Sequence, residues 1–276
     1  MKILLTGASS YVGARLFFDL SKQFDIIGTF HGNQLSNKLI PLDITDESQV
    51  KETFFIQKPD IIIHVAANPN PRTCATNPEA AILLNQTATH YVVNQANAIG
   101  AKIIFMSSFA AINPDDVYGN TKAKSEEYVK TTTAGWVILR PSVILGFSPN
   151  TKNDRTFNRI LKNLDEKTAA VYDISWKFQT TYVGHISEVI HEIIKRNLWN
   201  NVIPLVNLDL KSRYDIAFDI LRGFHIPVSP INNHDPMRTI TDDLSSLKAL
   251  KLPIYSYEAM IEQIINEIHQ RKKYSL

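Results

Sequence analysis

The stretch Thr6-Gly7-Ala8-Ser9-Ser10-Tyr11-Val12-Gly13 decides the fold, because it joins the first apolar run of the chain to the first helix-like segment. Glycine at such a turn lets the backbone bend tightly and brings N–H groups and the helix N-terminus against a pyrophosphate. Small residues at a strand-to-helix turn also serve packing alone, which is the alternative. We predict a dinucleotide-binding loop formed by Gly7, Ser9, Ser10, Tyr11, Val12 and Gly13.

Outward from this loop, short apolar runs alternate with segments of helical period. The runs predicted as strands are Lys2–Thr6, Asp25–Phe30, Lys38–Leu42, Asp60–His64, Lys102–Ser107, Trp136–Arg140 and Asn201–Val206. Helices are predicted near 11–23, 46–57, 77–99, 117–132, 154–165, 185–196, 212–223 and 256–270. Runs such as Ile61-Ile62-Ile63 lack alternation, as a strand covered on both faces requires. The pattern predicts an α/β fold built on a Rossmann-type, doubly wound parallel sheet.

The pattern loosens after Gly146. A Pro/Asn/Lys loop follows over Phe147–Asn153, and a Pro-rich, irregular region is predicted from Ile226 to Pro236. Because no repeat or low-complexity linker separates the parts, we predict a smaller C-terminal substrate lobe that is interleaved with the first domain. The NAD(P)-binding Rossmann domain is predicted over residues 1–147 with about 182–207. The substrate-binding lobe is predicted over about 148–181 with 208–276.

The composition is typical of a soluble globular protein, with 44% hydrophobic and 20% charged residues. A formal charge of +2 is too small to favour nucleic acid or a membrane surface as partner. Cys74 is the single cysteine, so no internal disulfide forms, and the scattered His64, His185 and His191 lack metal-ligand spacing. No apolar run approaches a membrane span. We expect a cytoplasmic protein that binds no metal, membrane or nucleic acid.

The end of the second predicted strand bears on the choice of cofactor. A site that prefers NAD places a carboxylate there for the ribose 2′-OH, but this strand ends Gly28-Thr29-Phe30-His31. NADP is therefore favoured, with His31 or Lys38 able to add positive charge, and NAD stays open. Asp43, just after the third strand, is a candidate for holding the adenine; the alternative is that it caps the following turn.

Tyr118 and Lys122 lie four residues apart at the start of a predicted helix, so both side chains lie on one face. An adjacent ammonium and the positive nicotinamide favour the phenolate and bring the tyrosine pKa toward working pH. Tyr118 then protonates a carbonyl oxygen, to which a serine at the end of the preceding strand, Ser107-Ser108, hydrogen-bonds. The alternative is an exposed tyrosine and lysine on an amphipathic helix.

These residues resemble the extended short-chain dehydrogenase/reductases, and among them the dTDP-4-dehydrorhamnose reductase branch. The similarity includes Thr6–Gly13, Leu42-Asp43-Ile44-Thr45, Asp60–Ala67, Asn85, Phe105–Ser108, Val117–Lys122 and Leu139-Arg140-Pro141. The resemblance implies that Ser108 orients the carbonyl, Tyr118 donates the proton, and Lys122 binds the ribose. It also implies cofactor contacts from Ile44, Ala66, Ala67, Pro141 and Val143, and a nucleotide-linked 4-keto sugar as substrate of an NADPH-dependent reductase.

The chain departs from the family pattern at three points, one of which is the segment Asn68–Asn77, where the acidic residues expected in the rhamnose branch are lacking. Ser10 replaces a glycine, and only nine residues separate Ser108 from Tyr118, where sugar-nucleotide reductases carry a longer loop. Two other functions stay open. One is a non-catalytic, NADP-binding regulatory subunit, similar to the methionine adenosyltransferase β subunit. The other is a sugar-nucleotide epimerase or dehydratase, which is disfavoured because Phe109 stands where dehydratases carry an acidic residue.

Polar and aromatic groups beyond the predicted sheet are the candidates for contacting the substrate. They are Trp176, Lys177 and Arg238, of which Lys177 and Arg238 are candidates for a diphosphate. The alternative for each charged residue is an ordinary surface position. The sequence names neither the sugar nor its nucleotide, and it leaves the oligomeric state open, with a homodimer as one option.

Overall fold

The computed structural model describes residues 1–235 and 237–274. Pro236, the last residue of the region predicted to be irregular, lies outside the described residues. So do Ser275 and Leu276, the end of the predicted substrate lobe.

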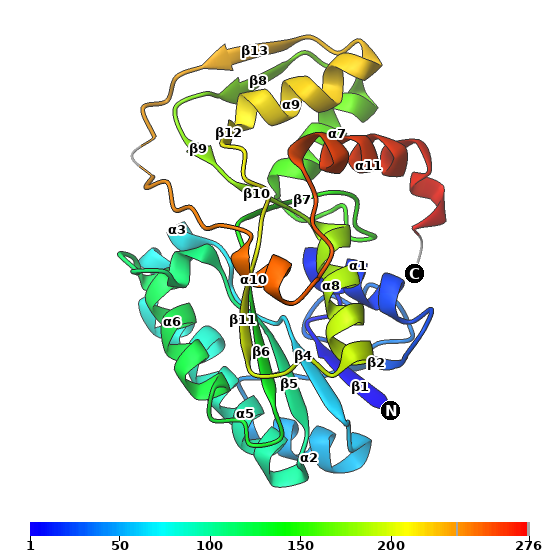
Figure 1. The fold of residues 1–276 in the computed structure, drawn as a ribbon, viewed down its shortest axis with the longest axis vertical. Helices are drawn as coiled ribbons and strands as arrows, with labels where there is room; N and C mark the ends of the chain where they lie inside the picture. The colour runs from blue at the N-terminus through cyan, green and yellow to red at the C-terminus, as the bar shows by residue number, and fades with distance from the viewer. Residues whose placement is uncertain (236, 275–276) are drawn as a thin grey trace.

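The centre of the molecule is a parallel sheet with the strand order β11-β6-β5-β4-β1-β2-β3 (Figure 1). Its described strands are β1 (Lys2–Thr6), β2 (Asp25–Phe30), β3 (Ile40–Pro41), β4 (Ile61–His64), β5 (Lys102–Met106), β6 (Trp136–Pro141) and β11 (Asn201–Leu205). The chain builds outward from β1 through β2 to β3 and then returns to place β4 on the other side of β1. This reversal is the point where such sheets bind ligands. The predicted Rossmann-type fold is confirmed.

Helices cover both faces of the sheet. On one face, α1 (Tyr11–Leu20) and α8 (Val183–Arg196) bury Leu16, Ile186 and Ile190 against the strands. On the other, α2 (Glu47–Gln57), α5 (Ala88–Ile99) and α6 (Val117–Val129) bury apolar side chains that include Phe54 and Val92. Strands covered on both sides must be apolar throughout, which is why the Ile61–Ile63 run shows no alternation.

A smaller lobe sits beyond one end of the sheet (Figure 1). It contains α7 (Thr156–Glu166), β8 (Ala170–Asp173), α9 (Arg213–Leu221), the 3-10 turn Arg222–Phe224, β13 (Val228–Ile231), α11 (Tyr257–His269) and the 3-10 turn Arg271–Lys273. Its helices share a separate apolar core, in which Phe157, Ile220 and Ile264 are fully buried. Two short strand pairs lie below it, β7 (Val143–Leu145) with β10 (Thr180–Tyr182) and β9 (Lys177–Phe178) with β12 (Lys211–Ser212).

A buried ion pair joins this lobe to the sheet domain. Arg15 of α1 lies 2.6 Å from Glu267 of α11. The other oxygen of Glu267 accepts a hydrogen bond from the Phe147 N–H at 2.9 Å. Because breaking a buried pair leaves an uncompensated charge, this contact fixes α11 on α1.

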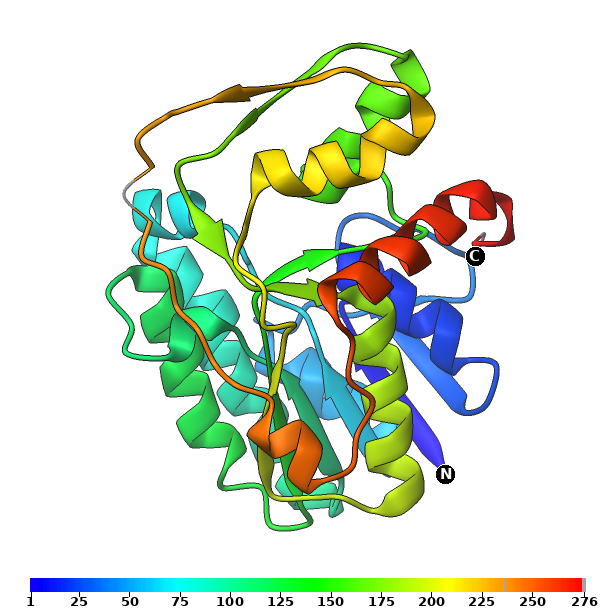
Figure 2. The ribbon, with the colours of Figure 1, turned by 45° about the horizontal axis from the view of Figure 1, so that its top comes forward.

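The chain returns from the lobe to the sheet domain after β13. This returning segment passes beside α3 (Pro71–Thr76) and α6 and leads into α10 (Ser245–Ala249) (Figure 2). Leu244, Leu247 and Leu252 pack into the core of the sheet domain, although the prediction assigns them to the substrate lobe. The predicted division into domains thus differs from the packing at this segment, because the three leucines cover the apolar face beside β11.

The helix predicted over 77–99 is confirmed as a continuous helical run over residues 78–99, which contains a π-helical segment. Asn77 has φ −138° and caps α4 (Pro78–Ala81), so a separate α3 ends before it. A π-helical segment over Ile82–Thr87 follows and leads into α5. There the Asn85 carbonyl accepts hydrogen bonds from the Thr89 and Ser125 hydroxyls. π-bulges occur often at functional sites, and apolar periodicity does not report them.

The irregular region predicted from Ile226 to Pro236 contains a strand. β13 pairs in parallel with β8, in register Val228 to Ala170 through Ile231 to Asp173. Pro230 is tolerated because β13 is an edge strand, where a missing N–H breaks no sheet ladder. In the described residues, no helix is long and apolar enough to cross a membrane.

Candidate active site

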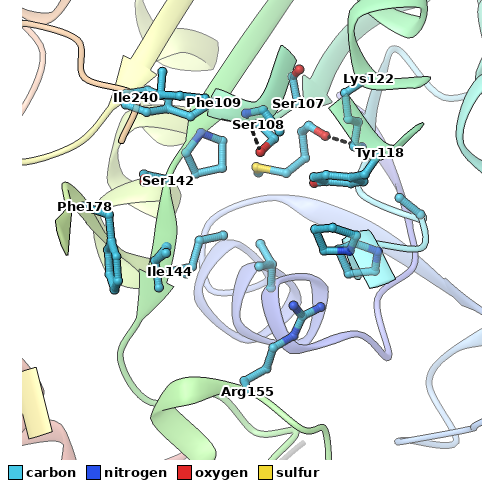
Figure 3. Close-up of a pocket in the computed structure, with 18 of the residues that line it drawn as sticks. Ser107, Ser108, Phe109, Tyr118, Lys122, Ser142, Ile144, Arg155, Phe178 and Ile240 are labelled. Atoms are coloured by element: carbon cyan, nitrogen blue, oxygen red, sulfur yellow. Dashed lines mark hydrogen bonds between the residues drawn. The ribbon is translucent and has the colours of Figure 1, made fainter. Parts of the chain in front are cut away.

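A cavity of about 390 Å³ lies where the sheet meets the smaller lobe. Its lining comes from the start of α1, from the ends of β5 and β6, from α6, and from β7 and β9. Figure 3 shows Ser108, Tyr118 and Lys122 on one side of this space and Ile144 and Phe178 across it. The volume is in the range of small-molecule sites, and the position is the one where open α/β sheets bind ligands.

The nucleotide loop requires glycine at two positions. Gly7 has φ +71°, and a Cβ there would lie 2.8 Å from the Ala66 Cα. Gly13 packs against the Gly7 carbonyl, so a side chain at Gly13 would clash with backbone. The two glycines hold β1, α1 and the end of β4 close together, as a dinucleotide loop requires.

Ser10, which replaces the family's glycine, caps α1. Its backbone is extended, with φ −74° and ψ 170°, a conformation open to any residue. Its hydroxyl oxygen accepts a hydrogen bond from the Gly13 N–H at 3.0 Å. The replacement therefore adds an N-cap without strain. The first-turn N–H groups of Tyr11 and Val12 are the donors that a pyrophosphate would use.

His64 supports the loop from below. Its ring nitrogens lie 2.7 Å from the Thr6 hydroxyl and 3.1 Å from the Thr89 hydroxyl. Burial lowers the pKa of His64 to about 3, and the nearby Lys122 adds to this shift. The Thr6 oxygen also accepts hydrogen bonds from the Val65 and Ala66 N–H groups. A neutral His64 thus holds the segment that carries Ala67 to the cavity wall.

The short segment between Ser108 and Tyr118 brings both residues to the lining of one cavity. Ser108 caps a 3-10 turn, Phe109–Ala111, and accepts a hydrogen bond from the Ala110 N–H at 3.2 Å. Gly119 packs directly on the Ala110 carbonyl, where a Cβ would clash. α6 therefore lies against the turn, and Ser108 and Tyr118 line the same cavity. Nine intervening residues suffice because this glycine permits the close approach.

Burial acts against the lowering of the Tyr118 pKa that is predicted from Lys122 and the nicotinamide. Burial raises the pKa of Tyr118, which is 8% exposed. The Ser108 hydroxyl and the Arg155 guanidinium oppose this rise without reversing it. Desolvation of the phenolate thus outweighs the stabilising groups that the folded chain supplies.

Lys122 is buried beneath the cavity floor. Its ammonium donates a hydrogen bond to the Met106 carbonyl at 2.8 Å and lies 4.7 Å from the centre of the Phe105 ring. Burial lowers the pKa of Lys122 to about 8, although Glu126 acts against this shift. The alternative of an exposed tyrosine and lysine is thereby excluded, since both side chains are almost fully buried.

The neighbouring Ser107 is engaged elsewhere. It donates a hydrogen bond to Glu126 at 2.5 Å, and the Arg140 guanidinium binds both oxygens of the same carboxylate. This buried network joins α6 to β5 and β6. Of the two serines, Ser108 is therefore the one that lies outside this network, and it lines the cavity together with Tyr118.

The residues predicted for the adenosine end lie away from the cavity. His31 is exposed, and its ring lies 3.6 Å from the Asp43 carboxylate. Asp43 accepts hydrogen bonds from the Thr45 N–H and hydroxyl. Burial opposes ionisation of Asp43, but these two bonds outweigh it and hold its pKa below the usual range. Ile44 is buried in the core on the α2 side of the sheet. Asp43 thus caps the turn that it begins. Ile44 packs in the core and lies apart from the cavity lining.

The lobe side of the cavity is aromatic and cationic. Trp176 packs on Phe178 with ring centres 4.4 Å apart, and the Arg213 guanidinium lies 5.0 Å from the Trp176 ring. Lys177, between the two aromatic residues, is exposed and lies outside the cavity lining. Arg238 lines the cavity but donates hydrogen bonds to the Ile112 and Asn113 carbonyls. It ties the returning C-terminal segment to the Ser108–Tyr118 segment.

The cavity lining includes residues that sequence reasoning did not single out. They are Val65, Pro69, Pro71, Met106, Ala110, Asp116, Ser142, Ile144, Arg155, Thr156, Phe178, Arg213, Met237 and Ile240. Pro141 and Val143, the residues predicted to contact the cofactor, line the cavity together with the start of α1. Among the described residues, no group of three or more His, Cys, Asp or Glu side chains is arranged to hold a metal ion.

Comparison with known proteins identifies the family and the fold. The model of the RmlD substrate binding domain matches residues 1–252. The methionine adenosyltransferase 2 subunit beta of Xenopus tropicalis is 24% identical over 263 residues, which cover 88% of this chain and 76% of that protein. The dTDP-4-dehydrorhamnose reductase of Salmonella typhimurium is 27% identical over 156 residues, 51% of each chain.

A solved structure shows the same fold. The dTDP-4-dehydrorhamnose reductase of Bacillus anthracis, in complex with NADP, superposes with a TM-score of 0.82 at 21% identity. The match covers 96% of this chain and 98% of that one. At this identity the likeness establishes the architecture, while the residues of the cavity must carry any argument about chemistry.

Proposed function

The chain belongs to the RmlD substrate binding domain family, and on that premise we propose that it is an NADPH-dependent reductase of a nucleotide-linked 4-keto sugar. The observation that carries this proposal is the meeting of Ser108, Tyr118 and Lys122 with the start of α1 around one cavity (Figure 3). A dinucleotide loop, a proton donor and a cation are then within one site. These are the parts that reduction of a carbonyl requires.

The residues fit a dinucleotide cofactor. Gly7 leaves no space for a side chain because Ala66 packs against it, which holds the nucleotide loop close to the end of β4. The nicotinamide supplies the hydride when it is bound. Lys122 holds the nicotinamide ribose through its ammonium, and the cofactor contacts proposed for Ser9, Tyr11, Val12, Ala66, Pro141 and Val143 surround the same channel. NADPH is preferred because β2 and the residue after it end in Thr29-Phe30-His31 without a carboxylate, and NADH is the alternative.

Two hydroxyl groups of this chain act on the carbonyl oxygen of the substrate. Tyr118 donates its proton to the carbonyl oxygen of the substrate as that oxygen gains negative charge. Ser108 donates a hydrogen bond to the same oxygen and holds it beside the phenol. The phenolate that remains is stabilised by Lys122 and Arg155, whose positive charges favour the ionised form. The lobe side, with Trp176 and Arg213, faces the rest of the substrate.

A direct assay tests the proposal. The purified protein is mixed with NADPH and a panel of 4-keto sugar nucleotides that differ in sugar and nucleotide, and NADPH oxidation is followed by absorbance. We expect turnover with at least one member and loss of turnover in Tyr118→Phe. Product analysis separates reduction from epimerisation or dehydration, in which no NADPH is consumed. Full activity in Tyr118→Phe would contradict the proposed mechanism.

The second candidate is a non-catalytic, nucleotide-binding regulatory subunit. It is favoured by the match to methionine adenosyltransferase 2 subunit beta, which extends over 88% of this chain. This function predicts that the protein binds NADPH, oxidises none with any keto sugar, and changes the kinetics of a methionine adenosyltransferase when the two are mixed. Analytical ultracentrifugation of the mixture, with the protein alone as control, measures the complex. The same run tests the proposed homodimer.

We propose the cytoplasm as the compartment. The single cysteine, Cys74, is buried and contacts the Asn68 carbonyl through its thiol at 3.6 Å. A chain whose one thiol is packed in the interior suits reducing surroundings. Fractionation of cells that express the tagged protein tests this.

A further inference from the structure

The loop after β7 is fixed onto the nucleotide loop. The Asn150 side-chain amide donates a hydrogen bond to the Ser9 carbonyl at 2.6 Å, and the Ser148 hydroxyl donates one to the Tyr11 carbonyl at 2.6 Å. The Tyr11 hydroxyl in turn donates to the Gly146 carbonyl. Ser148 and Asn150 are almost fully buried. The segment 146–155, which includes the predicted loop Phe147–Asn153, is thus held in one place beside the start of α1.

Arg155 is the last residue of this segment and precedes α7. Figure 3 shows its side chain extending from the start of α7 into the space before Tyr118. Among residues 1–235 and 237–274, the structure gives its guanidinium no hydrogen bond and no ion pair. The adjacent Asp154 is taken by Arg159, which binds both carboxylate oxygens at 2.6 and 2.7 Å. A guanidinium that lines a cavity without an anion partner is suited to bind one.

The other cationic side chains of the cavity have partners. Arg238 binds two backbone carbonyls, and Arg213 lies 3.4 Å from Asp235 and 3.8 Å from Asp173. Lys122 donates a hydrogen bond to the Met106 carbonyl. Arg155 is therefore the cavity cation that an incoming anion reaches without displacing a contact within the described part of the chain.

We propose that Arg155 binds a phosphate of a nucleotide diphosphate ester in this cavity. The inference rests on the proposed function, because both the dinucleotide cofactor and a nucleotide-linked sugar carry that group. The position favours it: Arg155 lines the cavity with Tyr11 at the start of α1 and with Tyr118, and its charge opposes the rise that burial causes in the pKa of both phenols. A guanidinium matches a phosphate with two parallel hydrogen bonds, and the anchored loop holds it ready.

The test compares Arg155→Gln with a matched variant on the same loop, Lys152→Gln. Lys152 is exposed and outside the cavity lining, so its variant removes the same charge from the loop without touching the site. Dissociation constants are measured by calorimetry for NADPH and for 2′-AMP, which has the adenosine and 2′-phosphate without a pyrophosphate. They are then measured for dTDP and UDP in the presence of saturating NADP⁺.

The expected result is roughly a tenfold loss of affinity in Arg155→Gln for a ligand with a diphosphate, the size of one charged hydrogen bond. Affinity for 2′-AMP stays unchanged, which shows that the variant is folded. A loss confined to NADPH assigns Arg155 to the cofactor pyrophosphate, and a loss confined to dTDP and UDP assigns it to the substrate diphosphate. Both outcomes support the proposal.

The proposal is overturned when Arg155→Gln binds NADPH, dTDP and UDP as tightly as Lys152→Gln does. Such a result leaves the reductase function standing, because turnover of a keto sugar is a separate measurement. Conversely, a protein that binds NADPH through Arg155 and reduces no sugar supports the anion site while the proposed function fails. The two hypotheses are thus separated by one set of binding curves and one activity assay.

Discussion

Replacement of Lys122 by methionine is predicted to make the protein more stable near neutral pH. Burial lowers the lysine pKa from 10.5 to about 8. A shift of that size corresponds to a cost of about 3 kcal/mol for keeping the ammonium charged in the folded state. Methionine fills a similar volume without charge, but it leaves the Met106 carbonyl without its donor, at a cost of about 1–3 kcal/mol. We expect Lys122→Met to gain about 1 kcal/mol near pH 7.

The sign of this effect changes with pH. Below pH 8 the lysine is charged in both states, so the full cost is present. Between pH 8 and pH 10.5 only the unfolded chain holds the extra proton, and wild-type stability therefore rises with pH. Above that window the cost is gone while the neutral amine still donates to Met106. The variant is then expected to be less stable than the wild type, by about 1–3 kcal/mol.

Urea unfolding followed by circular dichroism at about pH 7 and about pH 10 measures both differences. Other titrating groups, including the buried tyrosines, are common to the two proteins and cancel in the difference. Lys130→Met, at the exposed end of α6, is the control and should show no such reversal. A Lys122→Met difference that is the same at both pH values would refute the reasoning, because it would mean that the ammonium is not desolvated.

Three further substitutions are predicted to act on function. Tyr118→Phe should lower turnover by roughly 10²–10⁴ while leaving the NADPH dissociation constant within a few-fold of wild type, as steady-state kinetics and fluorescence titration would show. Ser108→Ala should reduce kcat less than Tyr118→Phe does, because the phenol still contacts the carbonyl oxygen; an equal loss in both variants would contradict this order. His31→Asp should shift the preference from NADPH toward NADH, since a carboxylate there accepts from a ribose 2′-OH and repels a 2′-phosphate; equal affinities before and after the change would exclude His31 from the adenosine end.

The parts of the site that follow local rules could be predicted from sequence. Gly7 and Gly13 are required where β1 meets α1, and a spacing of four brings Tyr118 and Lys122 to one face of a helix. Each inference uses contacts between neighbours in the chain or the fixed order of a parallel sheet. Ser10 is instructive, because a departure from the family pattern proved to be an N-cap once its dihedral angles were known.

Lys177 shows that the alternation of side chains along a strand decides which residues can share a cavity. Successive residues of a strand face opposite sides, so Trp176 and Phe178 cannot share a side with Lys177. The two aromatic residues line the cavity, and Lys177 is exposed on the other side. The strand β9 found in the structure therefore makes the assignment of Lys177 to the substrate incompatible with that of Trp176. Arg238 offered no such signal, since its carbonyl partners, Ile112 and Asn113, lie far away in sequence.

Arg155 could not be predicted for a different reason. Its place depends on Ser148 and Asn150 reaching the carbonyls of Tyr11 and Ser9, contacts that span more than a hundred residues and involve no periodic pattern. The network of Ser107, Glu126 and Arg140 is of the same kind. Polar contacts between segments that are far apart in the sequence produce no periodic pattern of residues. The geometry of the site depends mainly on such contacts.

The buried groups of the site bear on the choice between a reductase and a binding subunit. A chain that only binds a nucleotide has a use for Lys122, which is proposed to contact the ribose in either function. It has no use for a phenol that must be buried in the cavity wall, since phenylalanine at position 118 fills the same space without a polar group to satisfy. The two functions thus diverge on one variant. In a binding subunit, Tyr118→Phe leaves NADPH affinity and partner regulation intact and costs nothing measurable. In a reductase it removes turnover while folding and NADPH binding persist, so the hydroxyl is accounted for only by proton transfer.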